Sequence, residues 1–272
     1  MQSAAPELAQ IKSAMKASWS AGDFGQIARY SAQTAEDFIA RTAIKQGTRV
    51  LDVACGTGNT AIPAAKTGAA VTGLDLVPSL LEQARQRAAA EKLNMVFQEG
   101  DAEELPFQDR EFDLVITMFG AMFAPRPDRV AAELVRVCKS GGQIAMANWT
   151  PEGFVGKQFL AMSEIVPPPP GIPAPILWGD EKVVRQRLSK GISKLVTTRQ
   201  KAHLNFPFAP NQVVAFFRQY FGPTQVAFSK LDGNRQAQLA TRLEALWNEH
   251  NVSNNGNTSV EAEYLDVRAT VA

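Results

Sequence analysis

The stretch of sequence that decides the fold is residues 50–61, VLDVACGTGNTA. Its first four residues form an apolar run with one acid, which is typical of a buried β-strand. Glycines follow at positions 56 and 58, and a helical pattern begins after them. Glycine allows a tight turn and lets the backbone approach a ligand without a Cβ in the way. The stretch therefore predicts a strand, a ligand-binding turn and a helix.

Short apolar segments around this turn alternate with helical patterns. We expect strands at residues 49–53, 69–75, 94–98, 112–117 and 143–148. Their continuous content of Val, Ile and Met is typical of strands that are buried on both faces of a parallel sheet. The alternation predicts an α/β fold with a doubly wound, mostly parallel sheet.

Four segments are expected along the chain. Residues 1–46 are amphipathic and predict a helical cover, and residues 47–150 predict the α/β core. Residues 151–210 contain a proline run at 167–170 and several aromatic residues, which predicts an insertion after the fifth strand that covers a ligand. Residues 211–272 are expected to complete the sheet.

The final segment has its own predicted elements. It contains a helical pattern from Gln212 to Phe221, an apolar run at 224–231 that predicts a strand, and a second helical pattern from Arg235 to His250. A last alternating stretch ends at Val271. Two late strands that frame a helix predict a seven-stranded sheet whose last strand is antiparallel.

Composition and charge exclude several classes of function. Of the 272 residues, 45% are apolar and 20% are charged, which is typical of a globular protein. Because 28 Lys and Arg balance 27 Asp and Glu, we expect no nucleic-acid partner. Two histidines and two distant cysteines predict neither a metal site nor a disulfide framework. The sequence shows no signal peptide or membrane span, so we expect a cytoplasmic monomer or homodimer.

Two carboxylates near the turn narrow the choice of ligand. Asp75 lies at the predicted end of the second strand, where a carboxylate can accept both hydroxyls of a ribose. Asp52 lies before Gly56, where its charge would repel a pyrophosphate. S-adenosylmethionine (SAM) carries an ammonium and a sulfonium, which the same carboxylate attracts. The pair of acids therefore favours SAM, although the glycine pattern alone also fits a dinucleotide.

Five motifs follow one another in the order of a known family. They are DVACGTG at 52–58, GLDL at 73–76, GDAEELPF at 100–107, FDLV at 112–115 and KSGG at 139–142. Together they resemble class I SAM-dependent methyltransferases, and most of all the small-molecule group that includes the ubiquinone/menaquinone-biosynthesis type. The resemblance covers residues 47–149. It implies an enzyme that uses SAM and releases S-adenosylhomocysteine.

The resemblance also implies cofactor-binding residues by position. They are Asp52, Ala54, Gly56, Gly58, Asp75, Leu76, Asp101, Ala102, Thr117 and Met118. Asp52 is expected to hold the amino group, directly or through water, and Asp75 to hold the ribose hydroxyls. Asp101 is expected to meet the adenine edge, with a helix N-cap as its alternative role.

Aromatic residues at strand ends and in the two covers predict an apolar, aromatic or polyketide-like small-molecule acceptor that is methylated on O or C. The candidate pocket residues, each with core packing as an alternative, are Trp19, Tyr30, Phe119, Phe123, Trp149 and Trp178. An activated methyl group requires mainly alignment and exclusion of water. No dedicated base is evident, and His203 is a weak candidate for that role.

Two other functions fit part of the pattern. An NAD(P)-dependent oxidoreductase would explain the glycines and Asp75, but not Asp52. A non-catalytic SAM-binding regulatory protein would keep the cofactor residues and fill its acceptor cavity with side chains.

Overall fold

The computed structural model describes residues 7–272, so residues 1–6 of the expected N-terminal cover lie outside the described part. A seven-stranded sheet with the order β3-β2-β1-β4-β5-β7-β6 forms its centre. The strands are β1 (Arg49–Val53), β2 (Ala70–Asp75), β3 (Val96–Glu99), β4 (Phe112–Met118), β5 (Cys138–Trp149), β6 (Ile192–Phe206) and β7 (Thr258–Val271). The first five run parallel, and β7 is antiparallel to both β5 and β6. The predicted fold class is confirmed.

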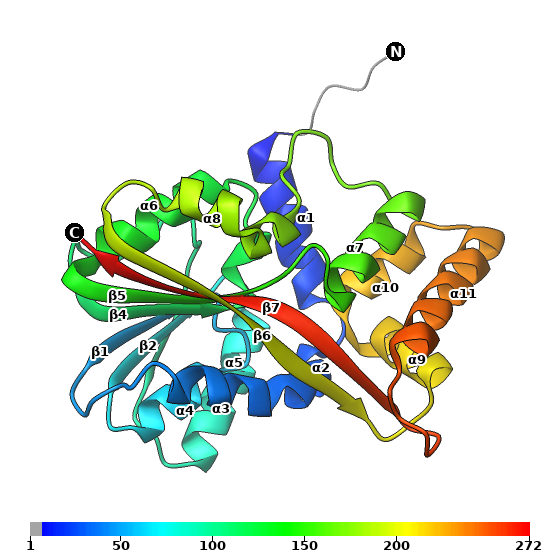
Figure 1. Cartoon of the computed structure of the whole chain (residues 1–272), viewed down its shortest axis with the longest axis horizontal. Helices are drawn as coiled ribbons and strands as arrows, with labels where there is room; N and C mark the ends of the chain where they lie inside the picture. Colours follow the sequence, from blue (N-terminus) through cyan, green and yellow to red (C-terminus); the bar gives the residue numbers. More distant parts are fainter. Residues whose placement is uncertain (1–6) are drawn as a thin grey trace.

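Helices cover both faces of this sheet. They are α1 (Leu8–Ser20), α2 (Phe24–Ala28), α3 (Ala32–Ala40), α4 (Ala61–Lys66), α5 (Pro78–Ala90), α6 (Pro127–Val137), α7 (Phe154–Ile165), α8 (Glu181–Arg187), α9 (Pro210–Tyr220), α10 (Gly222–Ser229) and α11 (Gly233–His250), with short 3-10 turns η1 (Arg29–Ser31), η2 (Ala121–Phe123) and η3 (Pro175–Gly179). Helices α3 and α4 lie along one face, and α6 and α8 along the other (Figure 1).

Side chains of the central strands pack into two separate apolar cores. Val50 of β1 joins Phe38 of α3 and Ala61 of α4 in one core. Its neighbour Leu51 joins Val130 of α6 in the other core. Successive side chains of a strand point to opposite faces. The continuous apolar run of β1 therefore reflects burial on both faces, as the sequence predicts.

The predicted strand near 224–231 is wrong, because this segment lies in helix α10 and the turn after it. Pro223 occupies the first turn of that helix, where its missing N–H needs no partner. The true edge strand is β6, which lies inside the predicted insertion 151–210. Its first half is largely polar, includes Lys194 and Arg199, and contains no fully buried side chain, so the apolar pattern expected of a buried strand is absent there.

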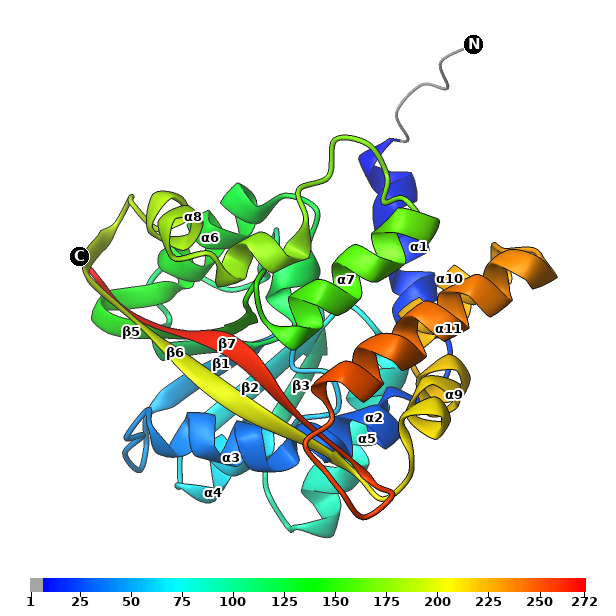
Figure 2. The same ribbon diagram turned by 45° about the vertical axis from the view of Figure 1, so that its right-hand side comes forward.

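The long β6–β7 hairpin joins the predicted segments 151–210 and 211–272. Its register runs from Ile192 opposite Val271 to Phe206 opposite Thr258. Figures 1 and 2 show that the hairpin extends past the other strands toward α9 and α11. There its buried side chains pack in one core with Trp247 of α11. A cover of α7, α9, α10 and α11 is thus anchored on the edge of the sheet itself.

No helix within residues 7–272 has the length and apolar character needed to cross a bilayer. In the same range, no cluster of three or more His, Cys, Asp or Glu side chains is arranged to hold a metal ion.

We expect Phe206→Ala to lower the free energy of unfolding by about 3 kcal/mol, because Phe206 is buried between the ring of Tyr30 and the ring of Trp247. His203→Ala on the exposed face of the same strand is the matched control and should change stability by less than about 0.5 kcal/mol. Urea denaturation measures both values. Equal effects of the two variants would contradict the assignment of faces along β6.

Candidate functional site

The carboxyl ends of β1 and β4 form the floor of the site. Ala54 after β1 and Phe119 after β4 both have left-handed backbones, with φ of 57° and 59°. This conformation is uncommon and strained for residues other than glycine and clusters at functional sites. Gly120 contacts the first turn so closely that an added Cβ would lie 2.4 Å from the Ala54 carbonyl oxygen. The two turns are therefore packed backbone against backbone.

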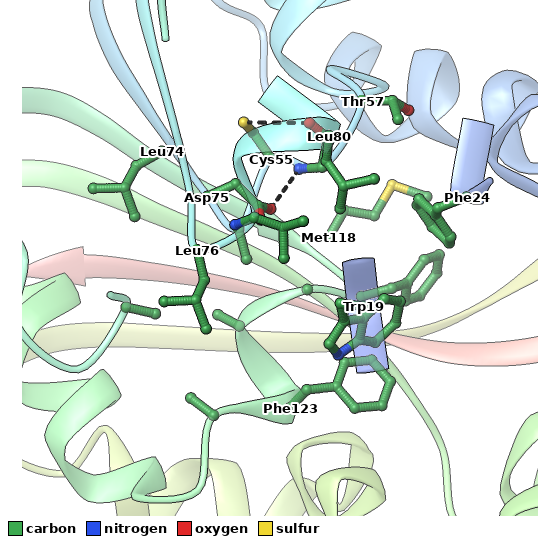
Figure 3. Close-up of a pocket in the computed structure, with 18 of the residues that line it drawn as sticks. Trp19, Phe24, Cys55, Thr57, Leu74, Asp75, Leu76, Leu80, Met118 and Phe123 are labelled. Carbon is green, nitrogen blue, oxygen red and sulfur yellow. Dashed lines mark hydrogen bonds between the residues drawn. The ribbon is translucent and has the colours of Figure 1, made fainter. Parts of the chain in front are cut away.

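A cavity opens above these turns. Its lining comes from the glycine turn, the ends of β2, β3 and β4, and the N-terminal helices. The lining residues include Met15, Trp19, Phe24, Ser31, Ala54, Cys55, Gly56, Asn59, Asp75, Leu76, Leu80, Asp101, Ala102, Met118, Phe119 and Phe123. Figure 3 shows Trp19, Phe24 and Phe123 gathered at one end of this cavity, away from Asp75 and Leu76. One end is thus aromatic and the other carries acids.

Asp75 fixes the glycine turn from the neighbouring strand. Its Oδ2 accepts a hydrogen bond from the Gly56 backbone N–H at 2.8 Å (Figure 3), and its Oδ1 accepts one from the Val77 N–H at 2.9 Å. Burial raises the pKa of this carboxyl, and the backbone hydrogen bonds oppose that rise. The carboxylate therefore has two roles, since it holds the turn and also lines the cavity.

Asp52 lies on β1 and is fully buried. Its Oδ2 accepts a hydrogen bond from the Thr60 hydroxyl at 2.6 Å, and its Oδ1 has no hydrogen-bond partner within residues 7–272. Burial raises the pKa of the carboxyl from 3.8 to about 7, although the Thr60 hydrogen bond lowers it. A nearby cation would stabilise the charged form of this carboxyl.

Asp101 ties the cavity to helix α1. Its Oδ1 accepts a hydrogen bond from the Glu103 N–H at 2.9 Å, so it stabilises a local turn rather than capping a helix. Its Oδ2 lies 2.5 Å from Nζ of Lys12, which is also 2.5 Å from the buried Glu103 carboxylate. A second ion pair joins Lys16 to Glu99. These ion pairs hold α1 beside the carboxyl end of β3 and the turn that follows it.

Asn59 connects the glycine turn to the N-terminal cover. Its side-chain amide donates to the Ala28 carbonyl at 2.7 Å and to the Ser31 hydroxyl at 3.3 Å. Its carbonyl oxygen accepts from Arg87 of α5 at 2.8 Å, and the same guanidinium donates to the Thr57 carbonyl at 2.5 Å. The turn and η1 are thereby held as one unit, and Ser31 lines the cavity between them.

A second cavity of about 310 Å³ adjoins the first and shares Trp19, Phe24, Ser31, Phe119 and Phe123 with it. This volume lies at the lower end of the range of about 300–1,000 Å³ that is usual for small-molecule sites. The other lining residues come from η1, β5, β6 and the cover helices. They include Ile27, Tyr30, Trp149, Val155, Gln158, Phe159, Met162, Ser163, Val166, Leu204, Phe206, Phe217, Phe221 and Trp247.

The structure brings most of the predicted cofactor residues together. Those that line the first cavity are Ala54, Gly56, Asp75, Leu76, Asp101, Ala102 and Met118. Three others lie behind its wall. Asp52 and Thr117 are buried in β1 and β4, and Gly58 packs its backbone against Ile62.

Five of the six predicted acceptor residues line a cavity. Trp19, Phe119 and Phe123 border both cavities, whereas Tyr30 and Trp149 border the second. The rings of Phe119 and Trp149 are stacked, with centroids 3.6 Å apart. The boundary between the two cavities is therefore largely aromatic.

Two other predicted residues, Trp178 and His203, lie away from both cavities. Trp178 lies in the apolar core on the α6 face, 1% exposed and covered by the guanidinium of Arg187, so it borders neither cavity. His203 is exposed, because Leu204 and Phe206 on alternate positions of β6 face the second cavity. It is therefore not placed to act as a base there.

Several residues in the two cavities or beside them were not assigned from the sequence. Asn59 lies inside the quoted glycine stretch, and an amide at that position was a usable signal. No sequence signal pointed to Lys12, Gln158 or Met162, because an amphipathic pattern does not identify the neighbour of each helix face.

Comparisons with known proteins agree with this geometry. Residues 50–142 match the family model described as a methyltransferase domain. An uncharacterised protein of Mycobacterium tuberculosis is 40% identical over 215 residues, which are 78% of this chain and 78% of the relative. The chain belongs to the class I SAM-dependent methyltransferases.

Two further proteins are similar to this chain, and the similarity covers different shares of it. The demethylmenaquinone methyltransferase of Deinococcus radiodurans is 39% identical over 124 residues, which are 44% of this chain and 52% of the relative. A crystal structure of a putative methyltransferase from Bacillus halodurans superposes with a TM-score of 0.60 at 20% identity, over 87% of this chain and 97% of the other. The second similarity supports the fold alone.

SAM is the cofactor of this family, and the first cavity fits its chemistry. Asp75 and Asp101 line the cavity, and the lining contains no Lys, Arg or His among residues 7–272. A pyrophosphate would meet carboxylates there, whereas a cationic amino-acid cofactor meets opposite charge. The buried Asp52 adds a carboxyl whose Oδ1 has no hydrogen-bond partner among residues 7–272.

We expect Asp52→Asn to alter the dependence of stability on pH. The folded-state pKa of Asp52 is raised to about 7, so its contribution to stability is fully present below about pH 4 and is lost as pH rises through about 7. Asn resembles the protonated form and does not lose this contribution. Relative to the wild type, the variant should therefore gain unfolding free energy between about pH 4 and about pH 8.

Asp113→Asn is the control for that experiment. A hydrogen bond from Lys139 lowers the pKa of Asp113, so its contribution to stability is present above its ordinary pKa and is lost as the pH falls. As the pH rises through the ordinary pKa of a carboxyl, the free energy of unfolding of this variant should therefore fall relative to that of the wild type. Urea unfolding across the pH range measures both differences, and parallel profiles of wild type and Asp52→Asn would refute the raised pKa.

Proposed function

We propose that this methyltransferase transfers the methyl group of SAM to a small apolar acceptor, aromatic or polyketide-like, at O or C. The second cavity carries the proposal. It borders the first cavity through Trp19, Phe119 and Phe123, and most of its lining is aromatic or aliphatic. Bound there, an acceptor would lie next to the cofactor and among apolar side chains, which favours the alignment and the exclusion of water that methyl transfer needs.

The likeness to a demethylmenaquinone methyltransferase supports a ring-containing acceptor of quinol type within this class, although it spans 44% of the chain. The open cavity of about 310 Å³ also favours catalysis over a purely regulatory SAM-binding role, because such a role needs no space beside the cofactor.

We assign the cofactor contacts by charge and position. Asp75 would accept the ribose hydroxyls, because it lines the cavity and is already oriented by two backbone N–H groups. Leu76 and Ala102 would flank the adenine, and Asp101 would meet its edge. When bound, SAM supplies a methyl group on a positively charged sulfur that is already activated for nucleophilic attack.

The glycine turn would receive the methionine end. Ala54 and Gly56 line the cavity with left-handed backbones, and Asp52 lies two residues before Ala54 on β1. We propose that Asp52 binds the amino group through water, because its carboxyl lies behind the cavity wall. Asn59 and Lys12 hold the N-terminal cover over this cavity.

The experiment that tests the proposed function is calorimetric titration of the purified chain with S-adenosylhomocysteine and with NAD. We expect micromolar binding of S-adenosylhomocysteine and no binding of NAD, because the cavity lining is acidic rather than basic. Binding of NAD without binding of S-adenosylhomocysteine would favour an oxidoreductase and refute the proposal.

Asp75→Asn should weaken S-adenosylhomocysteine binding by about 2 kcal/mol, because the ribose hydroxyls lose a charged acceptor. Asn is chosen since its side-chain oxygen can still accept one of the two backbone hydrogen bonds that hold the turn. Asp113→Asn is the control. Asp113 lies at the end of β4 that is remote from the cavity and pairs with Lys139, so this variant should bind as the wild type does. Unchanged affinity in Asp75→Asn would show that the ribose lies elsewhere.

A further inference from the structure

The second cavity is unusual for its lack of charge. Among its lining residues in the described range there is no Asp, Glu, His, Lys, Arg or Cys. Its polar side chains are Ser31, Gln158, Ser163 and Tyr30, beside a large majority of aromatic and aliphatic residues. A hydroxyl or an amide does not take up a proton near neutral pH.

Tyr30 does not supply a base either. Its hydroxyl accepts a hydrogen bond from the guanidinium of Arg29 at 3.1 Å, and that guanidinium also lies over the Tyr30 ring. Arg29 is exposed, so the hydroxyl end of Tyr30 is directed to the surface of the cover.

The ionisable side chains that line the first cavity are hydrogen-bonded, ion-paired or protonated, and the carboxyl of Asp52 lies behind the cavity wall. Asp75 accepts hydrogen bonds from the Gly56 and Val77 N–H groups. Asp101 is paired with Lys12. Burial raises the pKa of the Cys55 thiol well above its usual value, so it stays protonated.

From these observations we infer that the acceptor is an acidic phenol or enol on an apolar skeleton, which enters the second cavity as its anion. This inference rests on the proposed function and names the acceptor class for the same site. No side chain of the enzyme is then needed to remove a proton, because the acceptor has already lost it to solvent.

The transfer is balanced in charge. The oxygen or carbon nucleophile forms a bond to the methyl carbon with its own electron pair. The bond between that carbon and sulfur breaks, and its electron pair stays on sulfur. An anion and a sulfonium become a neutral methylated product and a neutral thioether, and no proton is left over. Opposite charges attract strongly in an apolar cavity, and the neutral products require no counter-ion there.

An amine acceptor fits these surroundings less well. It must lose a proton before it can attack, and its product remains a cation. The second cavity offers that cation ring faces, hydroxyls and the Gln158 amide, but no carboxylate among its described lining residues.

The first test is the pH profile of kcat/KM for a series of alkyl-substituted phenols of similar size whose own pKa values range from below to above neutrality. We expect the midpoint of each profile to follow the pKa of the phenol, with the acidic members turned over at least about tenfold faster at neutral pH. One midpoint shared by all phenols would reveal a base on the enzyme and overturn the inference. Faster turnover of matched amines would also overturn it.

The second test does not depend on turnover. A nitrophenol changes its absorbance on ionisation, so its state when bound can be observed directly. We expect it to bind as the anion when the chain is loaded with an amine analogue that carries a positive charge in place of the sulfonium. Loaded with S-adenosylhomocysteine, whose sulfur is neutral, the chain should shift the ionisation of the bound phenol to higher pH. Identical ionisation in both complexes would contradict charge pairing in the cavity.

A pair of variants places one added charge inside or outside the cavity. Gln158 lines the cavity from α7, and Leu160 on the same helix is 61% exposed. Gln158→Glu should lower kcat/KM for an acidic phenol about tenfold by repelling the anion, whereas Leu160→Glu should leave it unchanged. An equal effect of both variants would contradict an anionic acceptor.

Calorimetry separates the two levels of failure. If S-adenosylhomocysteine binds but no phenol or enol is methylated or bound, the acceptor class is wrong and the cofactor assignment stands. If S-adenosylhomocysteine does not bind, the proposed function and this inference fail together.

Discussion

The hydrogen bond from the Gly56 N–H to Asp75 Oδ2 joins the two strand ends on which the rest of the site depends. It links the turn after β1 to the end of β2, while the other oxygen of the same carboxylate holds the start of the segment that leads into α5. Behind it, the Cys55 N–H donates to the Leu74 carbonyl at 3.0 Å. With the turn fixed in this way, Ala54 can adopt its left-handed backbone and Gly120 can pack against it.

Two neighbouring cavities with different electrostatics follow from this arrangement. The acids belong to strand ends and to the turn after β3, and they meet at the carboxyl edge of the sheet, where open α/β folds bind their ligands. The second cavity is built mainly by helices of the two covers, whose inner faces are aromatic and aliphatic. A cationic cofactor and an apolar acceptor would therefore each find suitable surroundings, and the rings of Trp19, Phe24 and Phe123 lie where the two cavities meet.

The N-terminal cover is held by polar contacts at a few points. Asn59 binds the Ala28 carbonyl and the Ser31 hydroxyl, and Lys12 pairs with Asp101 and Glu103. On the other side, the β6–β7 hairpin carries the apolar packing of Phe206 and Trp247. The glycine turn and the second cavity are in this way parts of one packed unit.

The sequence by itself determined the parallel core, the glycine turn and the acids beside that turn, because these follow from local patterns and from the order of motifs along the chain. It did not determine the edge strand β6, whose polar first half lacks the apolar pattern of a buried strand, or the helix at 222–229, whose short apolar run fits strand and helix equally. Which of the predicted aromatic residues border the second cavity was decided by tertiary structure. Trp178 and Trp149 are both aromatic residues near the fifth strand, yet packing buries one in the core and places the other at the cavity. Which face of a helix or strand meets a cavity depends on neighbours that are distant in sequence, and no local pattern encodes that choice.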